Sequence, residues 1–169
     1  MSDTRKFLEF ERDAWRKLGL ARAAFIDFLL EHGRDYPTGP QTYAGRRDPA
    51  KRCFMNATLL ALGDDSLTYV EGRVSVCGLA IEHAWCVDAD GIVIDTTLAP
   101  SPTDGTRDRI TGYFGIPFQT DYLRKASLLN GVYGLLGFEA RKTLHKLVEL
   151  GLEDGQRWLL ERRARSRAT

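Results

Sequence analysis

Three residues that could carry out covalent chemistry follow one another in the middle of the chain: Cys53, His83 and Asp95. A cysteine attacks a carbonyl carbon as its thiolate, a histidine can accept and return a proton, and a carboxylate can orient the histidine ring. Together they predict the nucleophile, base and orienting residue of one site. Each also has a structural explanation of its own: a buried thiol, a hydrogen-bonded core histidine or a strand-end cap.

Cys53 opens the apolar segment CFMNATLLALG, and the pattern predicts a helix over residues 51–62. Apolar side chains nearly encircle this helix, which is typical of a central, buried helix. The first turn of a helix offers free backbone N–H groups and the positive end of the macrodipole, and both stabilise a thiolate. The adjacent cations Lys51 and Arg52 would lower the pKa of the thiol further.

His83 and Asp95 fall on two predicted strands that the turn sequence DADG joins. If residues 89–91 form a three-residue loop with Gly91 in the left-handed conformation, Trp85 lies opposite Asp95. His83 and Asp95 are then diagonal neighbours on one face of the sheet. A two-residue loop would put Asp95 on the other face, so the predicted site depends on this register.

Four more residues are candidates for substrate binding or for oxyanion stabilisation. Tyr43, in the loop before Cys53, is a candidate second oxyanion donor. Asn56 follows Cys53 by one helical turn and either lines the site or ties down a loop. Trp85 shares a face with the histidine and either forms a wall of the cleft or packs in the core. Glu71 lies on a predicted strand, where both substrate contact and solvent exposure are open.

The other elements follow from hydrophobic periodicity and from the glycines and prolines that interrupt it. Helices are predicted over residues 3–18 and 20–32, with Gly33 ending the second in a left-handed conformation, and later over 121–129, 138–150 and 154–165. Strands are predicted over 67–76, 81–87 and 92–97, loops over 35–52 and 99–109, and a short extended piece over 111–118. Segregated runs of helices and strands favour the α+β class. We expect one domain, residues 1–169, with N-terminal helices in 1–33, a catalytic core in 50–118 and C-terminal helices in 119–169.

Composition and charge are those of a globular protein. The chain has 169 residues, 43% of them hydrophobic and 28% charged, with a net charge of +1, which disfavours a nucleic-acid or membrane partner. No signal peptide or membrane anchor is recognisable, so we expect a cytoplasmic location. The three cysteines include no CxxC pair, which predicts reduced thiols and neither a metal nor a cofactor. A basic cluster at Arg46, Arg47, Lys51 and Arg52 either attracts an anionic substrate or forms a solvated face.

The order of a cysteine at a helix start, HAW on a strand and VID after a short acidic turn resembles the transglutaminase-like branch of the papain-like superfamily. CFMNA also resembles the nucleophile segment of arylamine N-acetyltransferases. The likeness covers roughly residues 50–98. It implies a core in which the nucleophile-bearing helix packs on a small antiparallel sheet, with Cys53, His83 and Asp95 as catalytic residues.

The resemblance implies a cysteine-dependent amide hydrolase or acyltransferase that works through a thioester on Cys53. Its substrate would be a peptide, a protein side-chain amide or a small amide. Two alternatives are a non-catalytic binding module with the same fold and an acetyltransferase similar to the arylamine enzymes. The sequence leaves the oligomeric state open.

Overall fold

The computed structural model describes residues 3–19, 22–37, 48–98, 110–137 and 140–165. Within them lie the helices α1 Asp3–Lys17, α2 Arg22–His32, α3 Cys53–Gly63, α4 Thr120–Asn130, α5 Arg141–Leu150 and α6 Leu152–Arg165. The strands are β1 Arg34–Tyr36, β2 Thr68–Val76, β3 Leu79–Val87, β4 Val93–Ile94 and β5 Ile110–Phe118. Helices and strands occupy separate stretches of the chain, and the expected α+β class is confirmed.

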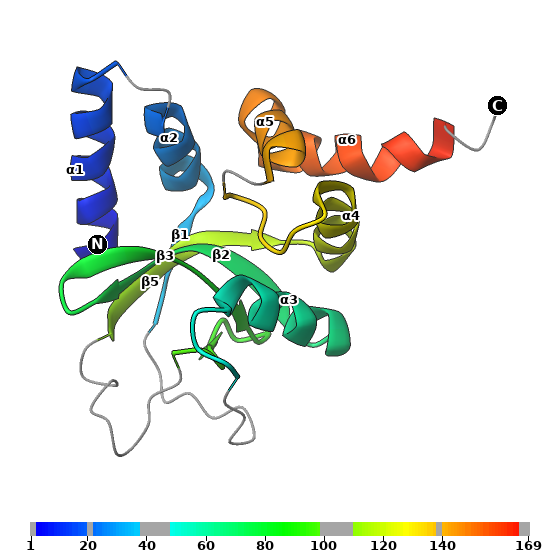
Figure 1. The fold of residues 1–169 in the computed structure, drawn as a ribbon, viewed down its shortest axis with the longest axis horizontal. Helices are drawn as coiled ribbons and strands as arrows, with labels where there is room; N and C mark the ends of the chain where they lie inside the picture. The colour runs from blue at the N-terminus through cyan, green and yellow to red at the C-terminus, as the bar shows by residue number, and fades with distance from the viewer. Residues whose placement is uncertain (1–2, 20–21, 38–47, 99–109, 138–139, 166–169) are drawn as a thin grey trace.

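The five strands form one antiparallel sheet in the order β1-β5-β2-β3-β4 (Figure 1). β2 and β3 form a long hairpin whose turn consists of Cys77 and Gly78, both with positive φ (52° and 79°). This is the backbone conformation that two-residue hairpin loops require. β4 pairs only with the last two residues of β3, so over Leu79–Trp85 the outer edge of β3 has no partner strand among the described residues.

The helices cover one face of the sheet, and Figure 1 shows α1, α2 and α4–α6 above it with α3 alongside β3. α3 also packs on this face, because the thiol of Cys86 on β3 donates a hydrogen bond to the carbonyl of Ala57 on α3. The main hydrophobic core lies between these helices and the sheet. The opposite face carries a second, smaller cluster: Tyr36, Val70, Val74, Trp85, Val87, Val93 and Tyr113.

The left-handed conformation expected at Gly33 is wrong, since Gly33 is not among the glycines with positive φ. A strand begins at the next residue instead. Glycine is required there by close packing, because a Cβ atom would lie 2.5 Å from the Leu29 carbonyl oxygen and 2.6 Å from the Phe114 ring. Glycine is therefore needed at the end of α2 because of close packing, and not because of a left-handed conformation.

The largest correction concerns β5, which was expected to be a short extended piece and is a nine-residue strand between β1 and β2. β1 was likewise assigned to a loop. Gly115 lies opposite Gly72, and a Cβ on Gly115 would come within 2.7 Å of the Glu71 carbonyl oxygen. Pro117 lies opposite Val70 and beyond the residues that pair with β1, so its missing N–H removes no bond to β1.

The strand expected over residues 92–97 is shorter and spans Val93–Ile94. The helices expected near the two ends are present, with boundaries shifted by up to three residues. Among the described helices, none is long and apolar enough to cross a lipid bilayer.

Candidate active site

Cys53 is the first residue of α3, and its thiol is half-buried. The first intrahelical bond runs from the Asn56 N–H to the Arg52 carbonyl (2.8 Å), so the preceding N–H groups of the first turn have no helical acceptor. The backbone N–H groups of Phe54 and Ala84 face the sulfur and help to lower the pKa of the thiol. The start of α3 therefore presents the thiol to backbone donors, as the sequence predicted.

His83 lies on β3 with its side chain on the face of the sheet that carries Trp85 and Tyr113. Its Nε2 atom lies 2.7 Å from Asp95 Oδ2. The other ring nitrogen, Nδ1, is then the atom available for the hydrogen bond that joins His83 to Cys53. Both His83 and Asp95 are buried, so the pair is shielded from water.

Asp95 follows β4 directly, and four donors satisfy its carboxylate. Oδ1 accepts the backbone N–H groups of Thr97 and Leu98, both at 2.9 Å. Oδ2 accepts the Tyr113 hydroxyl at 3.0 Å in addition to His83. Tyr113 lies on β5, and sequence reasoning missed it because that strand was not recognised. The alternation of side chains in ITGYFGIPF is the sequence pattern that could have indicated this strand.

The predicted hairpin register is confirmed. Asp88 N–H donates to the Ile92 carbonyl (3.2 Å), Gly91 N–H donates to the Asp88 carbonyl (3.0 Å), and Gly91 has a φ of 78°. Cys86 pairs with Ile94, which continues the register to Trp85 opposite Asp95. The three-residue loop thus brings Asp95 to the same face as His83.

The electrostatics of the site favour a thiolate beside an imidazolium. Burial alone would raise the pKa of Cys53, but the hydrogen bond and positive charge of His83 outweigh it and lower that pKa. Burial would also lower the pKa of His83, yet the charge and hydrogen bond of Asp95 raise it to about 9. The pKa of Asp95 is lowered, against the effect of burial, by His83 and by the backbone donors. Both shifts favour a proton on His83 over a proton on Cys53.

The other two cysteines lack this environment. Cys86 is buried, and burial raises its pKa to about 12. Cys77 is exposed in the β2–β3 turn. Of the three cysteines, only Cys53 combines a helix start with a histidine partner.

Asn56 resolves the choice left open by the sequence in favour of a structural tie. Its Nδ2 group donates to the Pro49 carbonyl and to Thr97 Oγ1, both at 2.9 Å. These bonds fasten the segment before Cys53 and the segment after Asp95 to α3. Because both amide hydrogens are used, Asn56 has no donor left for an oxyanion.

Trp85 and Glu71 are also buried, at 1% and 2% exposure, so Trp85 belongs to the core and Glu71 is not solvent-exposed. Trp85 stacks against the His83 ring at a centroid distance of 6.3 Å. The Glu71 carboxylate accepts the Tyr69 hydroxyl (2.7 Å) and the N–H groups of Leu135 and Leu136 (2.6 and 2.8 Å). It ties the segment after α4 to the sheet. Tyr43, Arg46 and Arg47 lie outside the described residues.

A small cavity of about 200 Å³ adjoins the start of α3 on the helix-covered face of the sheet. Its lining includes Phe54, Glu71, Glu82, Tyr133 and Gly134. A larger groove of about 480 Å³ lies farther along β3, between the hairpin and the first two helices. We call these the Phe54 cavity and the Phe10 groove.

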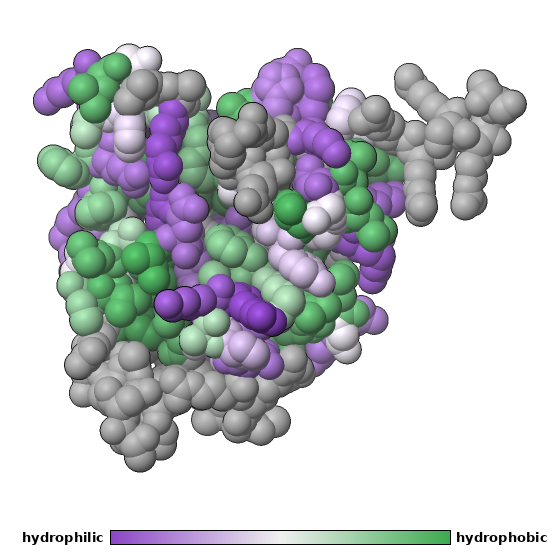
Figure 2. All heavy atoms as spheres, viewed as in Figure 1, coloured by the Kyte–Doolittle hydropathy of each residue, from purple (hydrophilic) through white to green (hydrophobic). Residues whose placement is uncertain are grey.

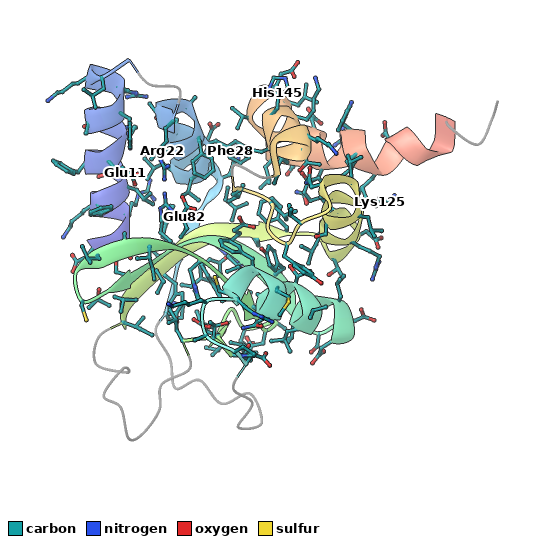
Figure 3. All side chains as sticks on the ribbon, in the orientation of Figure 1. Glu11, Arg22, Phe28, Glu82, Lys125 and His145 are labelled. Carbon is teal, nitrogen blue, oxygen red and sulfur yellow. The ribbon has the colours of Figure 1, made fainter. Side chains whose placement is uncertain are left out.

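Glu82 lines both spaces, and Figure 3 shows it between the sheet and the helices α1 and α2, near Arg22 and Glu11. Its carboxylate pairs with Arg73 Nη1 (2.8 Å) and Arg22 Nη2 (3.0 Å).

A scan of the chain against protein-family models finds no match, and neither do searches of curated proteins and of solved structures. Within the described residues, no three His, Cys, Asp or Glu side chains gather closely enough to hold a metal ion.

Proposed function

We propose that this protein is a cysteine-dependent amide hydrolase or acyltransferase with Cys53 as nucleophile, His83 as general acid and base, and Asp95 as the orienting residue. One observation carries the proposal: the His83 ring is hydrogen-bonded to the Asp95 carboxylate, and its charge and hydrogen bonding lower the pKa of the Cys53 thiol, which stands at a helix start. This is the arrangement that activates a thiol for attack on a carbonyl carbon.

In the first half of the reaction, the Cys53 sulfur attacks the carbonyl carbon of an amide and a C–S bond forms. The carbonyl electron pair moves to oxygen, where the Cys53 N–H at the start of α3 stabilises the negative charge. The pair returns as the C–N bond breaks, and the proton on His83 Nδ1 passes to the departing amine. A thioester on Cys53 remains.

In the second half, His83 takes a proton from water or from an acceptor amine, which attacks the thioester carbon. The C–S bond then breaks and the thiolate is restored. Attack by water makes the protein a hydrolase, and attack by an amine makes it an acyltransferase. We propose Tyr43, the candidate that the sequence offers, as the second donor to the oxyanion.

The arrangement of elements supports a core of the papain-like or transglutaminase-like kind, which we propose for residues 50–118. α3 bears the cysteine at its start and packs on β2 and β3 of the antiparallel sheet, while the histidine and aspartate come from β3 and from the residue after β4. A reducing cytoplasm would keep Cys53 as a free thiol, and we include that location in the proposal. Peptides, side-chain amides and small amides are the candidate substrates.

p-Nitrophenyl acetate tests the proposal, because its activated ester acylates a reactive thiol without a specific substrate. We expect a burst of p-nitrophenolate and an acetyl group on Cys53 in the mass spectrum. The burst should vanish in Cys53→Ala and persist in Cys77→Ala, which removes an exposed thiol. Acetylation of Cys77 as fast as that of Cys53, or no burst from the wild type, would refute the assignment.

A further inference from the structure

The outer edge of β3 leads directly to the nucleophile. The two-residue turn at Cys77 and Gly78 makes Val76 and Leu79 a hydrogen-bonded pair, so the odd-numbered residues of β3 bond to β2. The N–H and C=O groups of the even-numbered residues therefore point away from β2. The Asp88 N–H, which bonds to the Ile92 carbonyl, confirms this alternation, and the influence of the Ala84 N–H on the pKa of Cys53 agrees with it.

Beyond Ala84 the same edge continues through Glu82 and Ala80. No described strand pairs with it there, and the described backbone–backbone hydrogen bonds outside regular elements include none from these two residues. An unpaired row of N–H and C=O groups is a template for another strand. Here the row ends beside the Cys53 thiol, the proposed nucleophile. A strand that bound along this edge would therefore reach that thiol.

Side-chain pockets accompany the edge on one face. Glu82 lines both the Phe54 cavity and the Phe10 groove, and Ala80 lines the groove. The groove is walled by large apolar side chains, among them Phe7, Phe10 and Trp15. Figure 2 shows hydrophobic side chains gathered over the β2–β3 hairpin. The exposed Leu79 and Ile81 alternate with Ala80 and Glu82 and therefore lie on the opposite face of the strand.

We propose that an extended peptide binds as an added strand along residues 80–84 of β3, with its reacting carbonyl at Cys53 and an apolar side chain in the Phe10 groove. This inference rests on the proposed function and names its substrate class. Main-chain bonds to Glu82 and Ala80 would supply affinity, and alternate side chains would supply specificity. The substrate is thus a peptide rather than a small amide.

The spacing and the charges fit this substrate. Alternate residues of a strand are about 6.8 Å apart and point to the same face, so residues opposite Glu82 and Ala80 would face the two spaces in turn. Glu82 and Glu11 both pair with Arg22 and Arg73, so the two carboxylates and the two guanidinium groups beside the groove sum to zero charge. An apolar or aromatic side chain two to four residues from the reacting carbonyl is therefore favoured over a charged one.

Two electrophilic peptide probes cover both chain directions: acetyl-Phe-Ala-Ala-Ala chloromethyl ketone and chloroacetyl-Ala-Ala-Ala-Phe-amide. In each, the Cys53 sulfur displaces chloride from a CH₂ group, so a C–S bond forms and the C–Cl electron pair leaves with chloride. Each probe is made with its backbone amides N-methylated one at a time. An added strand directs only alternate amides to its partner, so methylation should slow labelling at alternate positions by about three- to tenfold.

The protein side of the edge is tested by Glu82→Pro, with Glu82→Ala as its matched control. Both lose the carboxylate, but only proline also removes the outward N–H, and proline is tolerated at a strand edge. Each peptide-probe rate is divided by the iodoacetamide rate of the same variant. We expect this ratio to be about three- to tenfold lower for Glu82→Pro than for Glu82→Ala.

Alternating sensitivity in at least one probe series supports the inference. If Cys53 reacts rapidly with iodoacetamide but neither series alternates, the inference fails while the proposed function stands. Slow iodoacetamide labelling of Cys53 would contradict both this inference and the proposed function. A labelling rate that falls as the protein concentration rises would show that a second copy of the chain occupies the edge, and would overturn the assignment of this edge to substrate.

Discussion

His83 Nε2 lies 2.7 Å from Asp95 Oδ2, and this contact directs the Nδ1 atom of the same ring to Cys53. One carboxylate thereby decides which nitrogen of the histidine holds the thiol proton. The opposite oxygen of Asp95 is anchored by the N–H groups of Thr97 and Leu98. The orientation of the base therefore depends on backbone bonds of the segment after β4.

Asp95→Asn should disable the site without removing any side chain. The two N–H groups that bond Oδ1 will hold the amide oxygen of the new asparagine, so its NH₂ group will face His83 Nε2. The ring must then accept at Nε2 and can no longer be an imidazolium. We expect iodoacetamide labelling of Cys53 at about pH 6 to fall at least about tenfold, since a lost opposite charge typically changes a pKa by about 1–3.

Asp90→Asn is the control for this variant, because it makes the same exchange at an exposed position of the neighbouring turn. Its labelling rate should match the wild type. Equal rates for the wild type and Asp95→Asn would show that Asp95 does not set the state of His83.

The pH dependence of labelling follows from the directions of the two pKa values. The pKa of Cys53 is lowered and that of His83 is raised to about 9, and both directions favour the proposed ion pair of a thiolate and an imidazolium in the neutral range. We expect the Cys53 labelling rate to be nearly constant from about pH 6 to 8. An ordinary thiol, with a pKa of about 8.5, gains almost tenfold per pH unit there. His83→Ala should restore that steep rise, and a steep rise in the wild type would argue against the ion pair.

Amide turnover should decline above about pH 9, where His83 loses its proton. Release of an amine needs this proton, whereas attack by the thiolate does not. The basic limb of the rate profile for an amide substrate therefore reports His83. A rate that keeps rising through pH 9 and beyond would exclude His83 as the acid.

Tyr113→Phe tests a positioning residue that the structure adds to the site. The change removes the hydroxyl that donates to Asp95 Oδ2, at a cost of about 0.5–1.5 kcal/mol in the free energy of unfolding. Tyr36→Phe removes a hydroxyl from the same apolar cluster, one that accepts a hydrogen bond from Arg34 Nε (3.0 Å) and lies outside the proposed site. Urea unfolding should show similar losses for both variants. Only Tyr113→Phe should alter the pH profile of Cys53 labelling, and identical profiles would assign Tyr113 a purely structural role.

Deletion of Asp90 tests the register on which the site depends. A two-residue loop would turn Asp95 to the opposite face of the sheet, so Cys53 should label as slowly as in His83→Ala. Gly91→Asn keeps the loop length and uses a residue that tolerates the left-handed conformation, so its labelling should be close to that of the wild type. Rapid labelling after the deletion would show that Asp95 is dispensable.

The sequence predicted the parts of this site that local rules determine. Turn chemistry at Gly91 fixed the register, and the apolar segment that Cys53 opens indicated the start of α3. It did not indicate β5, because Gly112, Gly115 and Pro117 normally weaken a strand. Gly115 is instead required by the close approach of Glu71 and Trp85, a contact between segments distant in sequence.

Tyr113 was not predicted because the strand that carries it, β5, was not predicted. Tyr113 reaches Asp95 only because β5 lies beside β2 in the sheet. The sequence left Asn56 open between lining the site and tying down a loop, and left Glu71 open between substrate contact and solvent exposure. Their bonds join segments 41 and more than 60 residues apart, so only the tertiary fold shows that they are structural ties.

The most direct test is competitive labelling of the three cysteines with iodoacetamide at about pH 6, read out for each cysteine by peptide mass spectrometry. An ordinary thiol is only about 0.3% thiolate at this pH. We expect Cys53 to label at least about tenfold faster than the exposed Cys77, buried Cys86 to remain unlabelled, and the advantage of Cys53 to disappear in His83→Ala. Labelling of Cys53 no faster than Cys77 in the wild type would contradict an activated nucleophile at the start of α3.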